Sequence, residues 1–185
     1  LFGANGTLAV SADVTGLTLG NHLVEFDEFM PNGRAAFLAN HSGVLWTYTA
    51  SDQNGDGVWE FTGGVSTGVL YPSGTLPRGV DYNGDGMSDL MWVSSTSPRQ
   101  VKLLPNVTPP ANTSPFFGGE ISGRLIPTST GDGGTIVGSA VQTGKNNDHL
   151  DANGDGREDV YLSMSVNYGP SGTSYSALLL GGWTL

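Results

Sequence analysis

The chain has 185 residues, enough for one domain with a hydrophobic core, and it has no cysteine, which excludes disulfides and thiolate metal sites. Its net charge is −10, from 17 acidic and 7 basic residues, so no basic patch is available to neutralise the phosphates of a nucleic acid. With 29 Gly, 10 Pro and no long 3.6-residue periodicity, the composition predicts an all-β chain of short strands, and no apolar run is long enough to insert into a membrane.

The first predicted unit starts near residue 27. Residues 26–38 have the outline of an acidic loop followed by an apolar strand, and they keep Asp27 and Gly33 but lack further oxygen-bearing side chains at regular spacing. A turn at residues 40–43 and a strand at residues 44–48 follow. We interpret this unit as a repeat that has lost a metal site.

The next acidic segment runs from Asp52 to Glu60 and reads D-x-N-G-D-G-x-x-E. One interpretation is a third metal site. The other is a hairpin tip, because the segment lies between two apolar runs and starts only 29 residues before the next acidic loop at Asp81. The sequence leaves both open, and we expect the hairpin tip.

Two nine-residue loops, at residues 81–89 and 151–159, share the pattern D-x-N-G-D-G-x-x-D. Calcium prefers six to eight oxygen ligands, and loops of this kind supply them from positions 1, 3, 5, 7 and 9, with a carbonyl at position 7 and a sharp glycine turn at position 6. The pattern therefore predicts two Ca²⁺ sites, whose ligands would be Asp81, Asn83, Asp85, the Met87 carbonyl and Asp89 in one loop and Asp151, Asn153, Asp155, the Arg157 carbonyl and Asp159 in the other. The alternative is a pair of Asx-rich turns without metal.

A β-hairpin is predicted after each of these loops. The first pairs residues 90–93 with 101–104, and the second pairs residues 160–166 with 175–180. The unit starts near 27, 81 and 151 are separated by 54 and 70 residues, and a Pro/Gly/Ser/Thr-rich insertion at 105–130 accounts for the longer interval. Each unit has room for about four short strands, which is the size of a propeller blade.

The two loops, the strand after each and their recurrence resemble the FG-GAP/VCBS family of calcium-loop β-propellers, over most of residues 20–182. The resemblance implies that the whole chain, 1–185, is one partial propeller of about three four-stranded blades, with further blades outside this chain. Residues 80–91 are also similar to propeller segments of bacterial Rhs and Tc-type toxins, although no YD repeats occur here.

These features favour a non-catalytic, calcium-stabilised scaffold or interaction module of a secreted or cell-surface protein, bacterial in origin, whose protein or glycan partner is unknown. No nucleophile, zinc or phosphate-loop motif points to an enzyme. Two alternatives stay open: a shell or plug segment of an Rhs/Tc-type toxin complex, and a lectin. For a lectin, the tryptophans could form a sugar-stacking platform, although strand positions favour core packing for Trp46, Trp59 and Trp92. In the insertion, Phe116 and Phe117 could form an exposed contact or cap the sheets.

Overall fold

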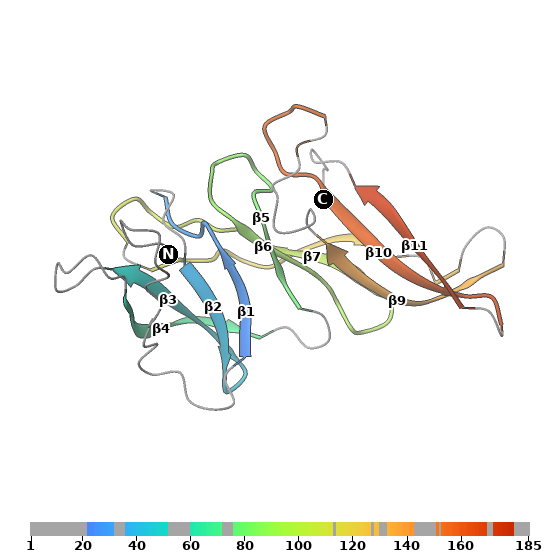
Figure 1. Ribbon diagram of the computed structural model, residues 1–185, viewed down its shortest axis with the longest axis horizontal. Helices are drawn as coiled ribbons and strands as arrows, with labels where there is room; N and C mark the ends of the chain where they lie inside the picture. The colour runs from blue at the N-terminus through green and yellow to red at the C-terminus, as the bar shows by residue number, and fades with distance from the viewer. Residues whose placement is uncertain are drawn as a thin grey trace, which may run out of the picture.

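A computed structural model describes residues 22–31, 36–51, 60–71, 76–112, 114–126, 128–129, 133–142, 151, 153–169 and 172–179. The described residues contain eleven strands and no helix, and the strands form three antiparallel sheets that stack side by side (Figure 1). The all-β prediction is therefore confirmed. Within these residues no sheet closes on itself, and no helix is long and apolar enough to cross a membrane.

Sheet 1 is a four-stranded meander of β1 (His22–Asp27), β2 (Ala36–His41), β3 (Val44–Ser51) and β4 (Glu60–Leu70). The predicted turn at residues 40–43 joins β2 to β3. Ser42 and Gly43 have φ values of 53° and 82°, and Gly43 N–H donates to the Asn40 side chain over 2.9 Å. Two successive positive φ values match the twist of a two-residue hairpin.

Sheet 2 is a second four-stranded meander, of β5 (Arg78–Val80), β6 (Asp89–Val93), β7 (Gln100–Leu104) and β8 (Ile121–Leu125). The predicted hairpin after the first acidic loop is confirmed as β6 and β7. Because β8 lies inside residues 105–130, part of the predicted insertion belongs to the sheet. The stretch before β8 folds back on itself, with Asn106 bridged to Phe117.

Sheet 3 contains β9 (Thr135–Gln142), β10 (Val160–Asn167) and β11 (Gly172–Leu179), with β10 in the middle. The hairpin of β10 and β11 confirms the second predicted pairing. In the described residues this sheet therefore has three strands, whereas each unit was expected to hold about four.

Strand β6 of sheet 2 is buried along its whole length because its two faces pack against the other two sheets. Leu90, Trp92 and Leu104 pack toward sheet 1, whereas Met91, Val93, Val101 and Leu103 pack toward sheet 3. Successive side chains of a strand point to opposite faces. The apolar run of residues 90–93 thus supplies two different cores at once.

The aromatic residues divide between core and surface. Trp92 is 6% exposed and belongs to the core between sheets 1 and 2, as its strand position predicts. Phe117 is 7% exposed and meets Phe29 edge-to-face, with ring centroids 6.1 Å apart, whereas Phe116 is 56% exposed. One ring of the pair is therefore buried between the sheets and the other is exposed, and a contact made by Phe116 stays a prediction.

Candidate acidic-loop site

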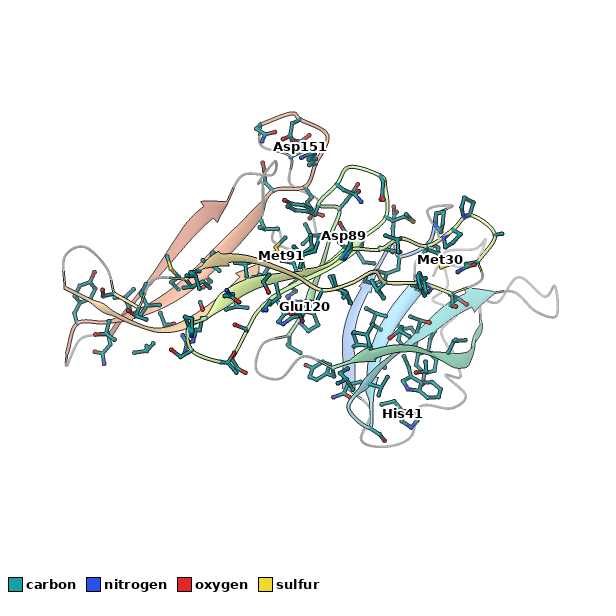
Figure 2. All side chains as sticks on the ribbon, turned by 180° about the vertical axis from the view of Figure 1, so that it is seen from behind. Met30, His41, Asp89, Met91, Glu120 and Asp151 are labelled. Carbon is teal, nitrogen blue, oxygen red and sulfur yellow. The ribbon has the colours of Figure 1, made fainter. Side chains whose placement is uncertain are left out.

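The two acidic loops lie next to each other at one edge of the sheet stack (Figures 1 and 2). The first loop leaves β5 after Val80 and returns as β6, whose first residue, Asp89, pairs with Val80. The second loop enters β10 at Val160. In both loops, positions 8 and 9 are buried, whereas positions 3 to 6 are exposed.

In the first loop, the side chain of Asp81 gathers three backbone N–H groups. Its Oδ1 accepts from Gly84 at 2.9 Å and from Asp85 at 3.1 Å, and its Oδ2 accepts from Gly86 at 2.9 Å. Asn83 Oδ1 accepts from the N–H of Asp85 at 2.8 Å, and Asp85 Oδ1 accepts from that of Met87 at 2.9 Å. The short polar side chains therefore set the loop conformation by bonding their own backbone.

The second loop repeats this arrangement bond for bond. Asp151 accepts from the N–H groups of Gly154, Asp155 and Gly156 at 2.7, 3.1 and 2.9 Å. The bonds from Asp155 N–H to Asn153 and from Arg157 N–H to Asp155 measure 2.8 and 3.0 Å. The sequence repeat is thus a structural repeat.

Glycine is required at positions 4 and 6 of each loop by the backbone. The φ values are +77° and +79° for Gly84 and Gly86, and +73° and +80° for Gly154 and Gly156. A Cβ atom is disfavoured in this left-handed region.

Position 9 carries a carboxylate that is shut off from solvent. Asp89 and Asp159 are both fully buried. Asp89 accepts the N–H of Asn106 at 2.6 Å and that of Tyr82 at 3.2 Å. Desolvation by burial nevertheless raises the pKa of Asp89 to about 7 from 3.8, with Asp85 and Asp81 adding to the rise and the two N–H bonds opposing it. A cation beside Asp89 would favour its ionised form.

The two loops are also hydrogen-bonded to each other. Asp81 N–H donates to Glu158 Oε2 at 3.0 Å, and Glu158 N–H donates to the Asp81 carbonyl at 2.9 Å. An equivalent bond joins sheet 2 to sheet 1, because Ser88 N–H donates to the Glu28 carbonyl at 2.9 Å. Position 8 of each loop therefore bonds the neighbouring unit.

Asn106 is a second link between units. Its side-chain N–H₂ donates to the carbonyls of Phe29 and Ser88 at 2.9 and 3.1 Å, and its Oδ1 accepts from both the backbone and the hydroxyl of Thr108. The residue is 1% exposed and so has its bonds inside the protein. Neither position 8 nor Asn106 was singled out from the sequence as a link, and position 8 gives no signal there because it is Ser88 in one loop and Glu158 in the other and bonds through its backbone N–H.

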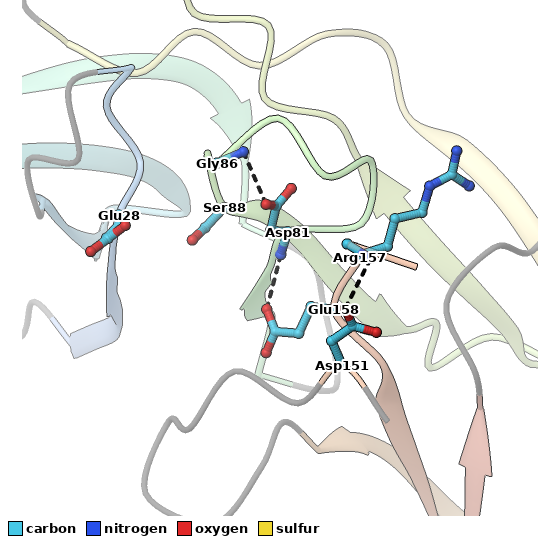
Figure 3. Close-up of a pocket in the computed structure, with 8 residues that line it drawn as sticks. Glu28, Asp81, Gly86, Ser88, Asp151, Arg157 and Glu158 are labelled. Atoms are coloured by element: carbon cyan, nitrogen blue, oxygen red, sulfur yellow. Dashed lines mark hydrogen bonds between the residues drawn. The ribbon is translucent and has the colours of Figure 1, made fainter. Parts of the chain in front are cut away.

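A cavity of about 250 Å³ opens where the loops meet (Figure 3). Its carboxylates come from three parts of the chain: Glu28 after β1, Asp81 in the first loop, and Asp151 and Glu158 in the second. Arg157 and Ser88 also line it. The loops therefore concentrate negative charge at one edge of the sheet stack.

The structure places all ten predicted ligand residues in these two loops and brings the loops together. It does not arrange any three His, Cys, Asp or Glu side chains of the described residues into a group that could hold a metal ion. The oxygens of Asp81, Asn83 and Asp85 face N–H groups of the loop instead. Of the third predicted site, residues 52–59 lie outside the described residues.

Comparison of the chain with protein-family models, with curated proteins and with solved structures found no match.

Proposed function

We propose that the chain is part of a calcium-stabilised β-propeller that serves as a non-catalytic scaffold or interaction module on a secreted or cell-surface protein. The observation that carries this proposal is the pair of acidic loops, which share one hydrogen-bond pattern and are hydrogen-bonded to the neighbouring units.

The sheets support the propeller part of the proposal. Sheets 1 and 2 are each four-stranded antiparallel meanders, which is the composition of a propeller blade. Consecutive sheets pack face to face through apolar side chains, and an acidic segment follows the first strand of each. A ring of such units would need more sheets than the described residues supply, since propellers have about four to eight blades.

The chemistry of the loops supports calcium. Each loop offers only oxygen donors, from three aspartates and one asparagine, and these suit a hard cation. The glycines at positions 4 and 6 already hold the backbone in a tight turn. Bound calcium would supply positive charge among carboxylates that otherwise repel one another, and it would require the oxygens to turn from the loop N–H groups toward the ion.

A structural role for the ion follows from where the loops lie. Because each loop bonds the preceding unit, any ligand that binds only the folded loop would stabilise the junction between two sheets. The exposed surface of the stack would then be free for a partner.

The test is calorimetric titration of Ca²⁺ into chelator-treated protein, together with thermal melting with and without the ion. We expect two sites per chain and a higher melting temperature with calcium. The matched variants Asp85→Asn and Asp155→Asn keep the side-chain shape and should each remove or weaken one site. Three sites in the unaltered chain would assign residues 52–60 as a further ligand loop. No heat and no shift in melting temperature would reject calcium and leave two Asx-rich turns.

A further inference from the structure

We propose that Asn153, in the second acidic loop, is a site of spontaneous deamidation, in which the side-chain amide is lost and the residue becomes aspartate or isoaspartate. The side chain of Asn153 is exposed, and the next residue is Gly154. Asparagine is among the thermolabile residues of proteins, and a following glycine leaves its own backbone nitrogen accessible because it has no side chain. The inference goes beyond the proposed function and does not depend on calcium.

The reaction needs only the chain itself and water. The backbone nitrogen of Gly154 loses its proton and forms a C–N bond to Cγ of Asn153. The side-chain nitrogen leaves the same carbon and takes up a proton, so ammonia is released and a cyclic succinimide remains. Water then opens the ring at either carbonyl carbon, which gives aspartate or isoaspartate. In sum, an amide and water become a carboxylic acid and ammonia, without oxidation or reduction.

Hydrogen bonds at the surface hold the reacting groups in the folded loop. Gly154 N–H donates to Asp151 Oδ1 at 2.7 Å, and Asn153 Oδ1 accepts from Asp155 N–H at 2.8 Å. The side-chain N–H₂ of Asn153 donates to Asp155 Oδ2 at 3.2 Å. The loop projects from the sheets, where Figure 2 labels Asp151, and water can replace these exposed partners when the loop opens locally. Local opening of this kind costs less than global unfolding, and it frees the nitrogen and Cγ to meet.

The first loop contains the same pair of residues, Asn83 and Gly84, in a more restricted position. The bonds within the two loops match. However, a Cβ atom at Gly84 would lie 2.7 Å from the carbonyl oxygen of Gly156, whereas one at Gly154 would meet no atom of the described residues within 4 Å. The backbone at Gly84 is therefore packed against the other loop. Opening around Asn83 must separate the loops, whereas opening around Asn153 leaves that contact in place.

A third exposed asparagine separates the effect of the glycine from the effect of exposure. Asn167 Oδ1 accepts the N–H of Gly169 at 2.8 Å, which is the bond to the second residue along that Asn83 and Asn153 also make. Asn167 is followed by Tyr168, whose side chain hinders approach to the backbone nitrogen. Asn167 should therefore stay unmodified where Asn153 reacts.

Deamidation would change both the charge and the backbone of the second loop. Aspartate adds a negative charge to residues 151–159, which already contain four acidic residues. Isoaspartate also lengthens the backbone by one atom between residues 153 and 154. The N–H groups of residues 154–156 would then shift relative to the Asp151 carboxylate that gathers them. The modified loop would lose the conformation that it shares with the first loop.

The experiment is incubation of the chain in a mildly alkaline buffer that contains a chelator, with samples taken over time, digested at acidic pH and mapped by mass spectrometry. The mass change from amide to acid and the uptake of isotopically labelled oxygen from water identify each modified residue. Enzymatic methylation measures isoaspartate. We expect Asn153 to convert roughly fivefold faster than Asn83, the factor that corresponds to one hydrogen bond between the loops, and Asn167 to stay unchanged.

The same incubation in urea shows whether the fold causes the difference. Both sites read Asn-Gly-Asp-Gly, so their rates should converge when the loops are unfolded. The control variant Asn153→Gln, whose longer side chain closes a ring far more slowly, should lose the signal at this position and keep that at Asn83. An Asn153 that reacts in urea but not in the native protein would overturn the proposal. So would a native rate at Asn83 that equals or exceeds that at Asn153, or a difference that persists in urea.

Discussion

Replacing Gly84 by alanine should destabilise the protein more than the same change at Gly154. The two glycines occupy position 4 of the two loops and have nearly the same φ, +77° and +73°. An added Cβ at Gly84 would lie 2.7 Å from the carbonyl oxygen of Gly156 in the other loop, whereas at Gly154 it would meet no atom of the described residues within 4 Å. The pair therefore separates the contact between the loops from the backbone preference that both sites share.

The size of the difference follows from this geometry. Both variants incur about 1–2 kcal/mol for placing alanine in the left-handed region, partly offset by the lower entropy of their unfolded chains. Only Gly84→Ala also requires the two loops to move apart, because the atom it meets belongs to the backbone. That movement strains or breaks the two bonds between Asp81 and Glu158, each worth about 1 kcal/mol. We expect Gly84→Ala to lose about 2 kcal/mol more than Gly154→Ala.

The assay is urea-induced unfolding in a buffer that contains a chelator, followed by circular dichroism and tryptophan fluorescence. For a chain of this length, 2 kcal/mol also corresponds to a fall of about 4–8 °C in melting temperature. The unaltered protein and both variants are measured together. Equal losses for the two variants would show that the loops do not touch in solution as described, and a greater loss for Gly154→Ala would reverse the argument.

Three further predictions concern the core, the link between units and the buried carboxylate. Phe117→Ala should cost about 3–5 kcal/mol in denaturant titration because its ring packs in the core, whereas the exposed neighbour Phe116→Ala should change stability by less than about 0.5 kcal/mol, and similar losses would contradict this assignment. Asn106→Ala should cost about 3 kcal/mol, since it leaves the buried carbonyls that Asn106 bonds without a donor, and an unchanged unfolding midpoint would remove the proposed link. Burial raises the pKa of Asp89 to about 7, so between about pH 4 and pH 7 the folded state keeps a proton that the unfolded state has lost. The free energy of unfolding of the metal-free protein should therefore fall by up to roughly 4 kcal/mol as the pH rises from about 4 to about 7. In unfolding measurements across pH, Asp89→Asn should flatten the dependence of stability on pH, and calcium should do the same by holding the carboxylate ionised. If the pH dependence survives in the Asp89→Asn variant, it belongs to other groups.

The loop conformations and the hairpins could be predicted from the sequence because residues close together in the chain determine them. The two loops have the backbone conformation that their glycines and Asx side chains favour, and the hairpins after them follow from apolar runs separated by turn residues. The division of residues 90–93 between two cores follows from strand geometry once a sheet is known to lie on either side.

The links between units could not be read in the same way. The side chain of Asn106 and the backbone of Ser88 and Glu158 bond residues that are distant in the chain, and no spacing rule predicts such partners. Likewise, a Pro/Gly-rich composition favoured an insertion at 105–130, although residues 121–125 pair with β7. Pairing at a sheet edge depends on a neighbouring strand more than on the segment's own residues.

The hydrogen bonds between the two loops also affect the order of folding and the rate of unfolding. Asp81 and Glu158 are 77 residues apart, as are Phe29 and Asn106. A contact between residues so far apart in the chain costs more loop-closure entropy, so it forms late in folding. The hairpins of each sheet join strands that are close in the chain, so they form early. The sheets should therefore form before they dock, with the acidic edge completed after the transition state. Interactions made after the transition state slow unfolding without speeding folding. On this reasoning, the acidic edge governs the lifetime of the native state, and the hairpins govern the rate at which it is reached.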